Sequence, residues 1–327
     1  MAAVTSPQLS VVVASHDRPI RLRWLLNALA EQTLDRGLWE VVVGHDSKGP
    51  ETEELLVSHP LTDAGVLRWR QLEPGYGKAG AHRNAALELA RAPVVVFTDD
   101  DCRPPPDWLE KIVAAVGRYP HAIVQGPVLP DPDEWAMLRS PHPRTQRFTD
   151  VPRASAECAN IAYPREIVDR VGGFDEMLDT AEDTDLNLRA RAAGASYVGD
   201  LRTLTYHAVA EGSLLDRIRD ARRWEGLPQL LARHPDIRRQ YTLGIVWRPS
   251  HLWLPVALLG LLRGRRNPRW SMLALPWLSY PFRAANHGTD VRGRLRTVLE
   301  LPGLAAIDIA EIAVLARGSI RWRSFLL

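Results

Sequence analysis

The stretch that most constrains the fold of this chain is Ala92–Arg103, which reads A-P-V-V-V-F-T-D-D-D-C-R. Its β-branched and aromatic run, Val94–Phe97, suits a short buried strand. Three carboxylates, Asp99, Asp100 and Asp101, follow, and the prolines after them prevent the strand from continuing. Adjacent acids at a strand end repel one another, and a divalent cation with its preference for oxygen ligands would relieve that repulsion. The pattern therefore indicates a metal site, and a solvated acidic turn that caps the next helix is the alternative.

Composition limits the class of protein. The 327 residues are 46% hydrophobic and 24% charged, which predicts one large globular domain with an appendage, or two domains. A net charge of only +2 gives no reason to expect nucleic acid as a partner. Cys102 and Cys158 lack metal spacing and suggest no disulfide framework, which favours a reducing, cytoplasmic setting. Residues 1–8 lack the pattern of a signal peptide, so we expect an unexported protein.

Strand and helix patterns alternate through the first hundred residues. Leu9–Ser15 is almost continuously apolar, as expected of a parallel strand covered on both faces. Leucines at helical spacing follow from Pro19 to about Gln32, and Trp39–Val43 reads as a second strand. A helix near 51–58, a strand near 66–72 and a helix near 81–91 come next. This alternation predicts an α/β fold with a doubly wound, Rossmann-like, mostly parallel sheet flanked by helices.

Polar residues follow three of these strands. His16 and Asp17 come after the first strand, Asp46 after the second and Asp99–Asp101 after the run at Val94–Phe97. Ligands of such sheets bind outside the carboxyl ends of the strands. The three groups are therefore expected on one rim, although they lie far apart in sequence.

A glycine-rich loop, Gly75–Asn84, opens the helix near 81–91. Backbone N–H groups at such a helix start, together with Lys78 and Arg83, could meet an anionic ligand. The alternative is a flexible turn without a ligand.

A tight turn, Val171–Glu176, leads into the acid-rich helix start at Glu182, Asp183 and Asp185. Acids in the first turn of a helix are stabilised by its dipole, so capping alone could explain them. Acids crowded at a helix start that follows glycines also suit a general base.

The order of these motifs resembles glycosyltransferase family 2, the inverting nucleotide-sugar transferases with the GT-A fold. The resemblance covers about two thirds of the chain, from Leu9 to His207. The matching stretches are V-V-V-A-S-H-D-R-P, E-V-V-V-G-H-D-S, G-K-A-G-A-H-R-N-A-A-L-E-L-A, V-V-V-F-T-D-D-D-C-R-P-P-P-D-W-L, A-N-I-A-Y-P-R-E, V-G-G-F-D-E and A-E-D-T-D-L-N-L-R-A.

The resemblance implies a role for each matching residue. Asp99–Asp101 would be the D-x-D element, with Asp101 the preferred ligand of a Mg²⁺ or Mn²⁺ ion that bridges the diphosphate of the nucleotide sugar. His207 could complete the metal shell, and a structural histidine is the alternative. Asp183 would be the base that deprotonates the acceptor hydroxyl, with Glu182 as second choice.

The remaining roles concern the two substrates. Residues implied to bind the nucleotide sugar are Ser15, His16, Asp17, Asp46, Lys78, Arg83, Asp99 and Asp100, and those on the acceptor side are Gly172, Gly173, Phe174 and Asp185. The family usually has two adjacent carboxylates after the second strand, and His45 stands at the first of these positions. Asp46 is compatible with uracil-type recognition, so UDP and other nucleoside diphosphates remain open.

Beyond His207 the composition changes. Leu214–Trp224 has the pattern of a basic amphipathic helix, and a final helix is expected near 304–316. Between them, two apolar runs, Trp247–Leu262 and Trp270–Phe282, flank an arginine-rich turn, and each is shorter than the roughly twenty residues that a membrane span needs. Tryptophans beside apolar runs suit an interfacial hairpin on an anionic membrane, and a helical core packed on the catalytic domain or on a second copy is the alternative.

The combined prediction is a catalytic domain over 1–212 and a mainly helical region over 213–327. We expect a metal-dependent inverting glycosyltransferase, peripheral at the inner face of the plasma membrane, with a glycan or lipid-linked acceptor of the cell envelope. One rival is a membrane scaffold that kept the fold without turnover. A phosphatase of the D-x-D-G-T type is a weaker rival, because Cys102 and Arg103 stand where Gly and Thr belong. A nucleotidyltransferase would want a glycine-rich loop after the first strand, where Ser15–Arg18 stands.

Overall fold

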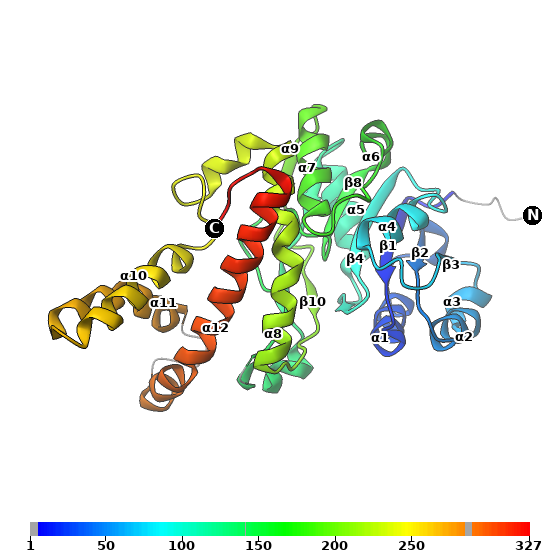
Figure 1. Ribbon diagram of the computed structural model, residues 1–327. Helices are drawn as coiled ribbons and strands as arrows, with labels where there is room; N and C mark the ends of the chain where they lie inside the picture. Colours follow the sequence, from blue (N-terminus) through cyan, green and yellow to red (C-terminus); the bar gives the residue numbers. More distant parts are fainter. Residues whose placement is uncertain (1–5, 141, 285–289) are drawn as a thin grey trace, which may run out of the picture. The chain divides into compact units, whose positions relative to one another are not determined.

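A seven-stranded sheet with the strand order β3-β2-β1-β4-β8-β6-β9 runs through the first part of the chain (Figure 1). The computed structural model describes residues 6–140, 142–284 and 290–327. The chain divides into two compact units. The first contains Met1–Ala136 and Thr145–Ala210, and the second contains Met137–Arg144 and Glu211–Leu327. The short segment 137–144 thus belongs with the second unit, although it lies within the first in sequence.

The parallel strands at the centre of the sheet confirm the predicted doubly wound arrangement. β1 (Leu9–Ser15) pairs in parallel with β2 (Trp39–His45) and with β4 (Val94–Asp99). Ser15 is in register with His45, and Ala14 with Asp99, so the carboxyl ends of the three strands share one edge. The other strands of this sheet are β3 (Leu67–Gln71), β6 (Ile123–Gln125), β8 (Ile161–Pro164) and β9 (Tyr197–Gly199).

Helices cover both faces of this sheet, which is why β1 reads as continuously apolar. Val11 and Val13 pack in one core cluster with the leucines of α1 (Pro19–Ala30), while Val12 packs in another with Phe97. The remaining helices of the first unit are α2 (Glu51–Ser58), α3 (Pro60–Asp63), α4 (Ala79–Leu87), α5 (Trp108–Arg118), α6 (Arg165–Val171) and α7 (Glu182–Ala192).

A second, three-stranded sheet was not predicted from the sequence. Its order is β5-β10-β7, formed by β5 (Cys102–Arg103), β10 (Thr205–His207) and β7 (Val128–Pro130). β5 and β10 are antiparallel, with Cys102 opposite His207. This small sheet therefore carries the residue after the acid triplet beside the histidine that the sequence singled out.

The second unit is helical. The predicted basic helix is α8 (Leu214–Asp220) followed by a short 3₁₀ turn. The two apolar runs become α10 (Pro249–Gly264) and α11 (Leu275–Ala284), and α9 (Leu227–Arg233) precedes them. Among the residues that the structure describes, no helix has both the length and the apolar character needed to cross a membrane.

The last helix, α12 (Val291–Trp322), is far longer than the 304–316 predicted from its apolar pattern (Figure 1). Its start is marked by Asp290, whose side chain accepts a hydrogen bond from the Gly293 N–H, which is an N-cap. Pro302 lies inside the helix without ending it. α12 packs through residues such as Leu304 on an apolar cluster formed by Leu254, Ala257, Ala274 and Trp277.

Candidate functional site

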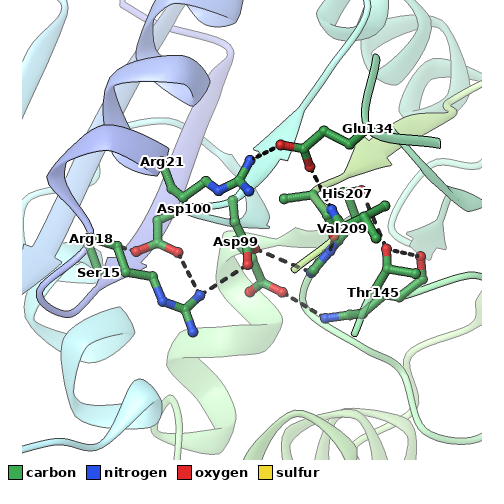
Figure 2. A network of polar contacts seen from close by, with 12 residues as sticks. Ser15, Arg18, Arg21, Asp99, Asp100, Glu134, Thr145, His207 and Val209 are labelled. Atoms are coloured by element: carbon green, nitrogen blue, oxygen red, sulfur yellow. Dashed lines mark hydrogen bonds and ion pairs between the residues drawn. The ribbon is translucent and has the colours of Figure 1, made fainter. Parts of the chain in front are cut away.

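Asp99, Asp101 and His207 come together at the carboxyl edge of the main sheet, with one possible ligand atom of each within 4.8 Å of the others. Figure 2 shows Asp99 and His207 in this group. Asp99 is the last residue of β4, and Asp101 follows two positions later. His207 ends β10, and Ala208 N–H donates to the Asp101 carbonyl at 2.9 Å. Backbone pairing between segments more than a hundred residues apart thus brings an imidazole to the acids.

The orientation of His207 bears on whether a cation fits. Its Nδ1 lies 2.8 Å from the Ala208 carbonyl oxygen, which can only accept, so Nδ1 carries the hydrogen. In the neutral ring Nε2 then presents a lone pair, and this atom lies 3.3 Å from Asp101 Oδ1. Two acceptors facing each other need a proton or a metal ion between them. A histidine whose other nitrogen donates to a carbonyl is the usual form of a metal ligand.

Asp100 points elsewhere. Its Oδ2 accepts a hydrogen bond from Ser15 Oγ at 2.8 Å, and its side chain is buried. Burial raises the pKa of Asp100 to about 7, with the Asp101 charge adding to the rise and Arg18 opposing it. Arg18 Nη1 lies 3.0 Å from Asp101 Oδ2 and 3.5 Å from Asp100 Oδ1, so this half-exposed arginine covers the acids (Figure 2).

Arg83 joins the acid triplet to the helix start of α7. Its Nη2 donates to Asp99 Oδ1 at 2.9 Å, and its Nη1 donates to Glu182 Oε1 at 2.7 Å. The guanidinium also lies over the Phe174 ring, 5.5 Å from its centre. A buried cation in the middle of α4 therefore holds two carboxylates from different elements.

Asp183 differs from its neighbour Glu182 in its partners. Among the described residues, Glu182 has an arginine within ion-pair distance, whereas Asp183 accepts from the Thr184 N–H at 2.7 Å. Burial raises the pKa of Asp183 well above the ordinary range, the Glu182 charge raises it further, and Arg83 opposes both. A carboxylate whose pKa lies closer to neutrality is a stronger general base than an ordinary aspartate.

The turn predicted on the acceptor side is built on α4. Asn84 accepts from the Phe174 N–H and donates to the Phe174 carbonyl, both at 2.9 Å. Gly173 has a φ of +71°, and a Cβ there would lie 2.7 Å from Asn84 Oδ1. Gly172, with a φ of +79°, ends α6 in the left-handed conformation that glycine adopts without strain.

Two predicted binding residues are bonded to protein groups. Lys78 Nζ donates to the Glu176 carbonyl at 2.9 Å and lies 3.1 Å from Asp179 Oδ1, so it holds the loop that follows Phe174. Asp185 is buried and accepts from Arg189 Nε at 2.7 Å. Their assignment to substrates stays a prediction.

Asp46 forms a separate polar group on the same rim. Its buried Oδ1 lies 2.5 Å from His16 Nδ1 and 3.1 Å from His82 Nε2, and its Oδ2 accepts from the Gly77 N–H at 2.5 Å. Burial opposes ionisation, but Gly77, His16 and His82 outweigh it and lower the pKa of Asp46. Asp17, with a φ of +49°, accepts from the Lys48 N–H at 2.8 Å and shapes the turn beside this group.

His45 does not replace a carboxylate at this rim. Its ring is fully buried, and its Nε2 lies 2.8 Å from Glu53 Oε1 on α2. The departure from the family pattern therefore serves the packing of β2 against a helix, while Asp46 next to it faces His16 and His82.

Sequence reasoning missed three side chains of the site. Gln146 Nε2 donates to Asp99 Oδ2 at 3.0 Å, His82 faces Asp46, and Arg18 contacts Asp100 and Asp101. Gln146 lies in an irregular segment with no periodic pattern to mark it. For His82 and Arg18 a signal existed, because each adjoins a residue that had been placed on the rim.

Comparison with known proteins identifies the family. A model described as glycosyl transferase family 2 matches residues 10–172, and one described as glycosyl transferase family group 2 matches residues 94–286. Glycosyltransferase AglE of Haloferax volcanii is 25% identical over 198 residues, which cover 59% of this chain and 64% of that protein. Validoxylamine A glucosyltransferase of Streptomyces hygroscopicus subsp. jinggangensis is 29% identical over 223 residues, covering 58% of this chain and 52% of that protein. The matched region thus spans less than two thirds of these relatives.

Solved structures with similar coordinates support the fold. One is the mannosyltransferase PcManGT from Pyrobaculum calidifontis in complex with GDP-Man and Mn²⁺, with a TM-score of 0.59, 20% identity, and coverage of 96% of this chain and 87% of that one. Another is S. aureus TarS 1–349 in complex with UDP-GlcNAc, with a TM-score of 0.52, 18% identity, and coverage of 97% and 92%. The predicted fold is confirmed, and the chain belongs to glycosyltransferase family 2.

Proposed function

We propose that this chain transfers a sugar from a nucleotide-sugar donor to a hydroxyl acceptor with inversion, and that the reaction depends on Mg²⁺ or Mn²⁺. The single observation that carries metal dependence is the cluster of Asp99, Asp101 and His207, in which His207 Nε2 lies 3.3 Å from Asp101 Oδ1 while Nδ1 is bonded to the Ala208 carbonyl. Family membership supports the transfer reaction itself.

Asp99, Asp101 and His207 would hold the cation, which when bound supplies positive charge to the departing nucleoside diphosphate. Arg83 fixes Asp99 relative to Glu182 and so keeps the metal-binding acids and the helix start of α7 in one geometry. Asp183 would take the proton from the acceptor hydroxyl, since Arg83 forms its ion pair with Glu182 and the pKa of Asp183 is raised by burial.

We propose that Asp46 recognises the nucleobase by a hydrogen bond. Its carboxylate is held ionised by Gly77, His16 and His82, and an ionised carboxylate accepts the N–H of a base. Solved structures similar to this chain contain GDP-Man and UDP-GlcNAc, so both nucleotides belong in the first test.

The donor proposal is tested by titrating UDP-, GDP-, dTDP-, ADP- and CDP-sugars into the full chain by calorimetry, with and without Mn²⁺. We expect one class to bind only with Mn²⁺, and Asp101→Ala to abolish that binding. Asp133→Ala, a largely exposed acid paired with Arg103, is the matched control and should bind normally. If no nucleotide sugar binds to the folded protein, the hypothesis of a membrane scaffold without turnover replaces the hypothesis of an enzyme.

We also propose that the second unit docks on an anionic membrane, which would favour a lipid-linked or cell-envelope acceptor. Residues 237–289 contain eight arginines and no Asp or Glu. Within this segment α10, α11 and the turn between them expose large apolar side chains beside the arginine cluster Arg263, Arg265 and Arg266. The exposed apolar residues are Leu258, Leu259, Leu261, Leu262, Trp270, Met272 and Leu275.

Apolar side chains beside excess positive charge are the combination that binds anionic lipid surfaces, at about 1 kcal/mol per basic residue. Replacing Arg263, Arg265 and Arg266 by Gln should therefore weaken binding to phosphatidylglycerol vesicles about a hundredfold in flotation assays. The control replaces three exposed arginines of the first unit, Arg36, Arg170 and Arg191, and should leave binding unchanged. Equal losses in both variants, or binding that ignores lipid charge, would contradict membrane docking.

A further inference from the structure

A second group of metal-ligating side chains lies in the helical unit. His251 on α10 faces Asp308 and Glu311 on α12, with its Nε2 at 3.1 Å from Glu311 Oε2 and 4.0 Å from Asp308 Oδ1. The three ligand atoms lie within 4.8 Å of one another. This cluster shares no residue with the group at Asp99, Asp101 and His207.

The cluster is enclosed by protein. His251 is 2% exposed and Glu311 3%, and the Asp308 side chain is 13% exposed. Asp308 and Glu311 are three residues apart, which places both on one face of α12. Their neighbours include the apolar cluster of Leu254 and Trp277, where charged groups are costly unless they are compensated.

Other side chains also contact the two carboxylates. Trp277 Nε1 donates to Asp308 Oδ2 at 2.9 Å, and Ser250 Oγ lies 3.4 Å from Oδ1. Both of these partners of Asp308 are neutral. Glu311 is better compensated, because Arg248 Nη1 lies 3.2 Å from its Oε2 and Arg217 adds positive charge nearby. Of the two carboxylates, Asp308 therefore has less positive charge around it.

The state of the His251 ring is a separate observation. Its Nδ1 is buried and has no hydrogen-bond partner among the described residues, and the ring lies edge-on to Trp247 with 5.8 Å between the centres. Within the part of the chain that the structure describes, the polar contacts of the ring are with the two carboxylates at Nε2, so this nitrogen is directed at the acids.

We propose that His251, Asp308 and Glu311 form a second divalent-cation site that ties α10 to α12. One imidazole and two carboxylates are a ligand set that suits Zn²⁺. Trp277, which donates to Asp308 Oδ2, would orient that carboxylate by its outer hydrogen bond, as groups around metal ligands commonly do. Arg248 contacts Glu311 Oε2, the oxygen that also faces His251. The role is structural, because the ion would join two helices of the second unit without involving the sugar-transfer site.

The test uses the full chain carrying Asp101→Ala, which weakens the other candidate site. After dialysis against Zn²⁺ and then against metal-free buffer, the metal content and the Zn²⁺ affinity are measured by mass spectrometry and calorimetry. We expect one Zn²⁺ per chain, and a midpoint of thermal unfolding that rises with Zn²⁺. Adding His251→Gln or Asp308→Asn should weaken binding at least a hundredfold, whereas Glu225→Gln, a carboxylate of the same unit outside the cluster, should not.

His251→Gln preserves a donor toward Glu311, and Asp308→Asn preserves the shape of the side chain, so at least one folded variant is expected from circular dichroism. A folded parent that retains no Zn²⁺ would overturn the proposal and leave an ion-paired helix contact. Retention of Zn²⁺ in both variants would overturn it as well, because the ion would then lie elsewhere.

Discussion

Arg83→Gln should destabilise the first unit strongly, because Arg83 is the one cation in contact with both Asp99 and Glu182 among the described residues. Its nitrogens lie 2.9 Å and 2.7 Å from the two carboxylates, and the side chain is nearly fully buried. At an effective dielectric constant near 20, each such contact is worth about 4 kcal/mol before the desolvation of the ions is subtracted. Removing one partner of a buried ion pair typically has a net cost of about 3–5 kcal/mol.

The expected loss can be measured by chemical and thermal unfolding. For a unit of roughly two hundred residues, 3–5 kcal/mol corresponds to a fall in the unfolding midpoint of about 6–20 °C. The measurement should be made in EDTA, because a divalent cation near Asp99 could replace part of the missing positive charge. Added Mn²⁺ should then restore some stability to Arg83→Gln.

Arg70→Gln is the matched control. Arg70 pairs with Glu88, but both side chains are about half exposed, so the loss should stay below about 1 kcal/mol. A loss of the same small size in Arg83→Gln would refute the reasoning, since it would mean that Asp99 and Glu182 are not buried charges that depend on this arginine.

The other predictions concern catalysis and the double-glycine turn. Asp183→Asn should leave donor binding nearly unchanged in calorimetry and reduce turnover by about two to four decades; normal turnover would exclude Asp183 as the base. Because the raised pKa of Asp183 requires a higher pH for ionisation, the acidic limb of the pH–turnover profile should lie above the range near 4 of an ordinary aspartate. Glu182→Gln removes a neighbouring negative charge and should move that limb to lower pH, and an unmoved limb would show that another group titrates. Gly173→Ala should lower the unfolding free energy by more than 2 kcal/mol, because its Cβ would collide with Asn84, whereas Gly172→Ala has open space and should cost about 1 kcal/mol; equal losses would contradict this contact.

Much of the first unit could be predicted because its elements are long and periodic. β1 and α2 have the bounds expected from their residues, and the carboxyl-end rule placed Asp46 and Asp99 on one edge. The second sheet could not be found in this way, because strands of two or three residues such as β5 carry no alternation. Pairing of these strands is decided by tertiary contacts.

The site shows the same division. Motif residues were selected by type and spacing, and their roles stay predictions, whereas contacts such as Gln146 with Asp99 and His45 with Glu53 depend on how separate segments pack. In the second unit, α12 begins well before the predicted start because its N-cap, Asp290, precedes a stretch whose apolar residues remain exposed, such as Val291 and Leu295. A prediction that looks for the apolar residues of a buried helix face therefore leaves out this first part of α12.

The antiparallel pairing of Cys102 with His207 has a consequence for how this chain can vary in length. Side chains alternate between the faces of a strand, so a shift of one residue in this register would turn the imidazole away from Asp99 and Asp101. The two-residue spacing from Asp101 to Arg103 therefore has to stay constant. An insertion there would move His207 away from Asp99 and Asp101, although all three side chains would still be present in the sequence. Insertions in exposed turns such as the one at Gly194 have no such effect on register, so tolerated length changes should accumulate in those turns and avoid the acid triplet.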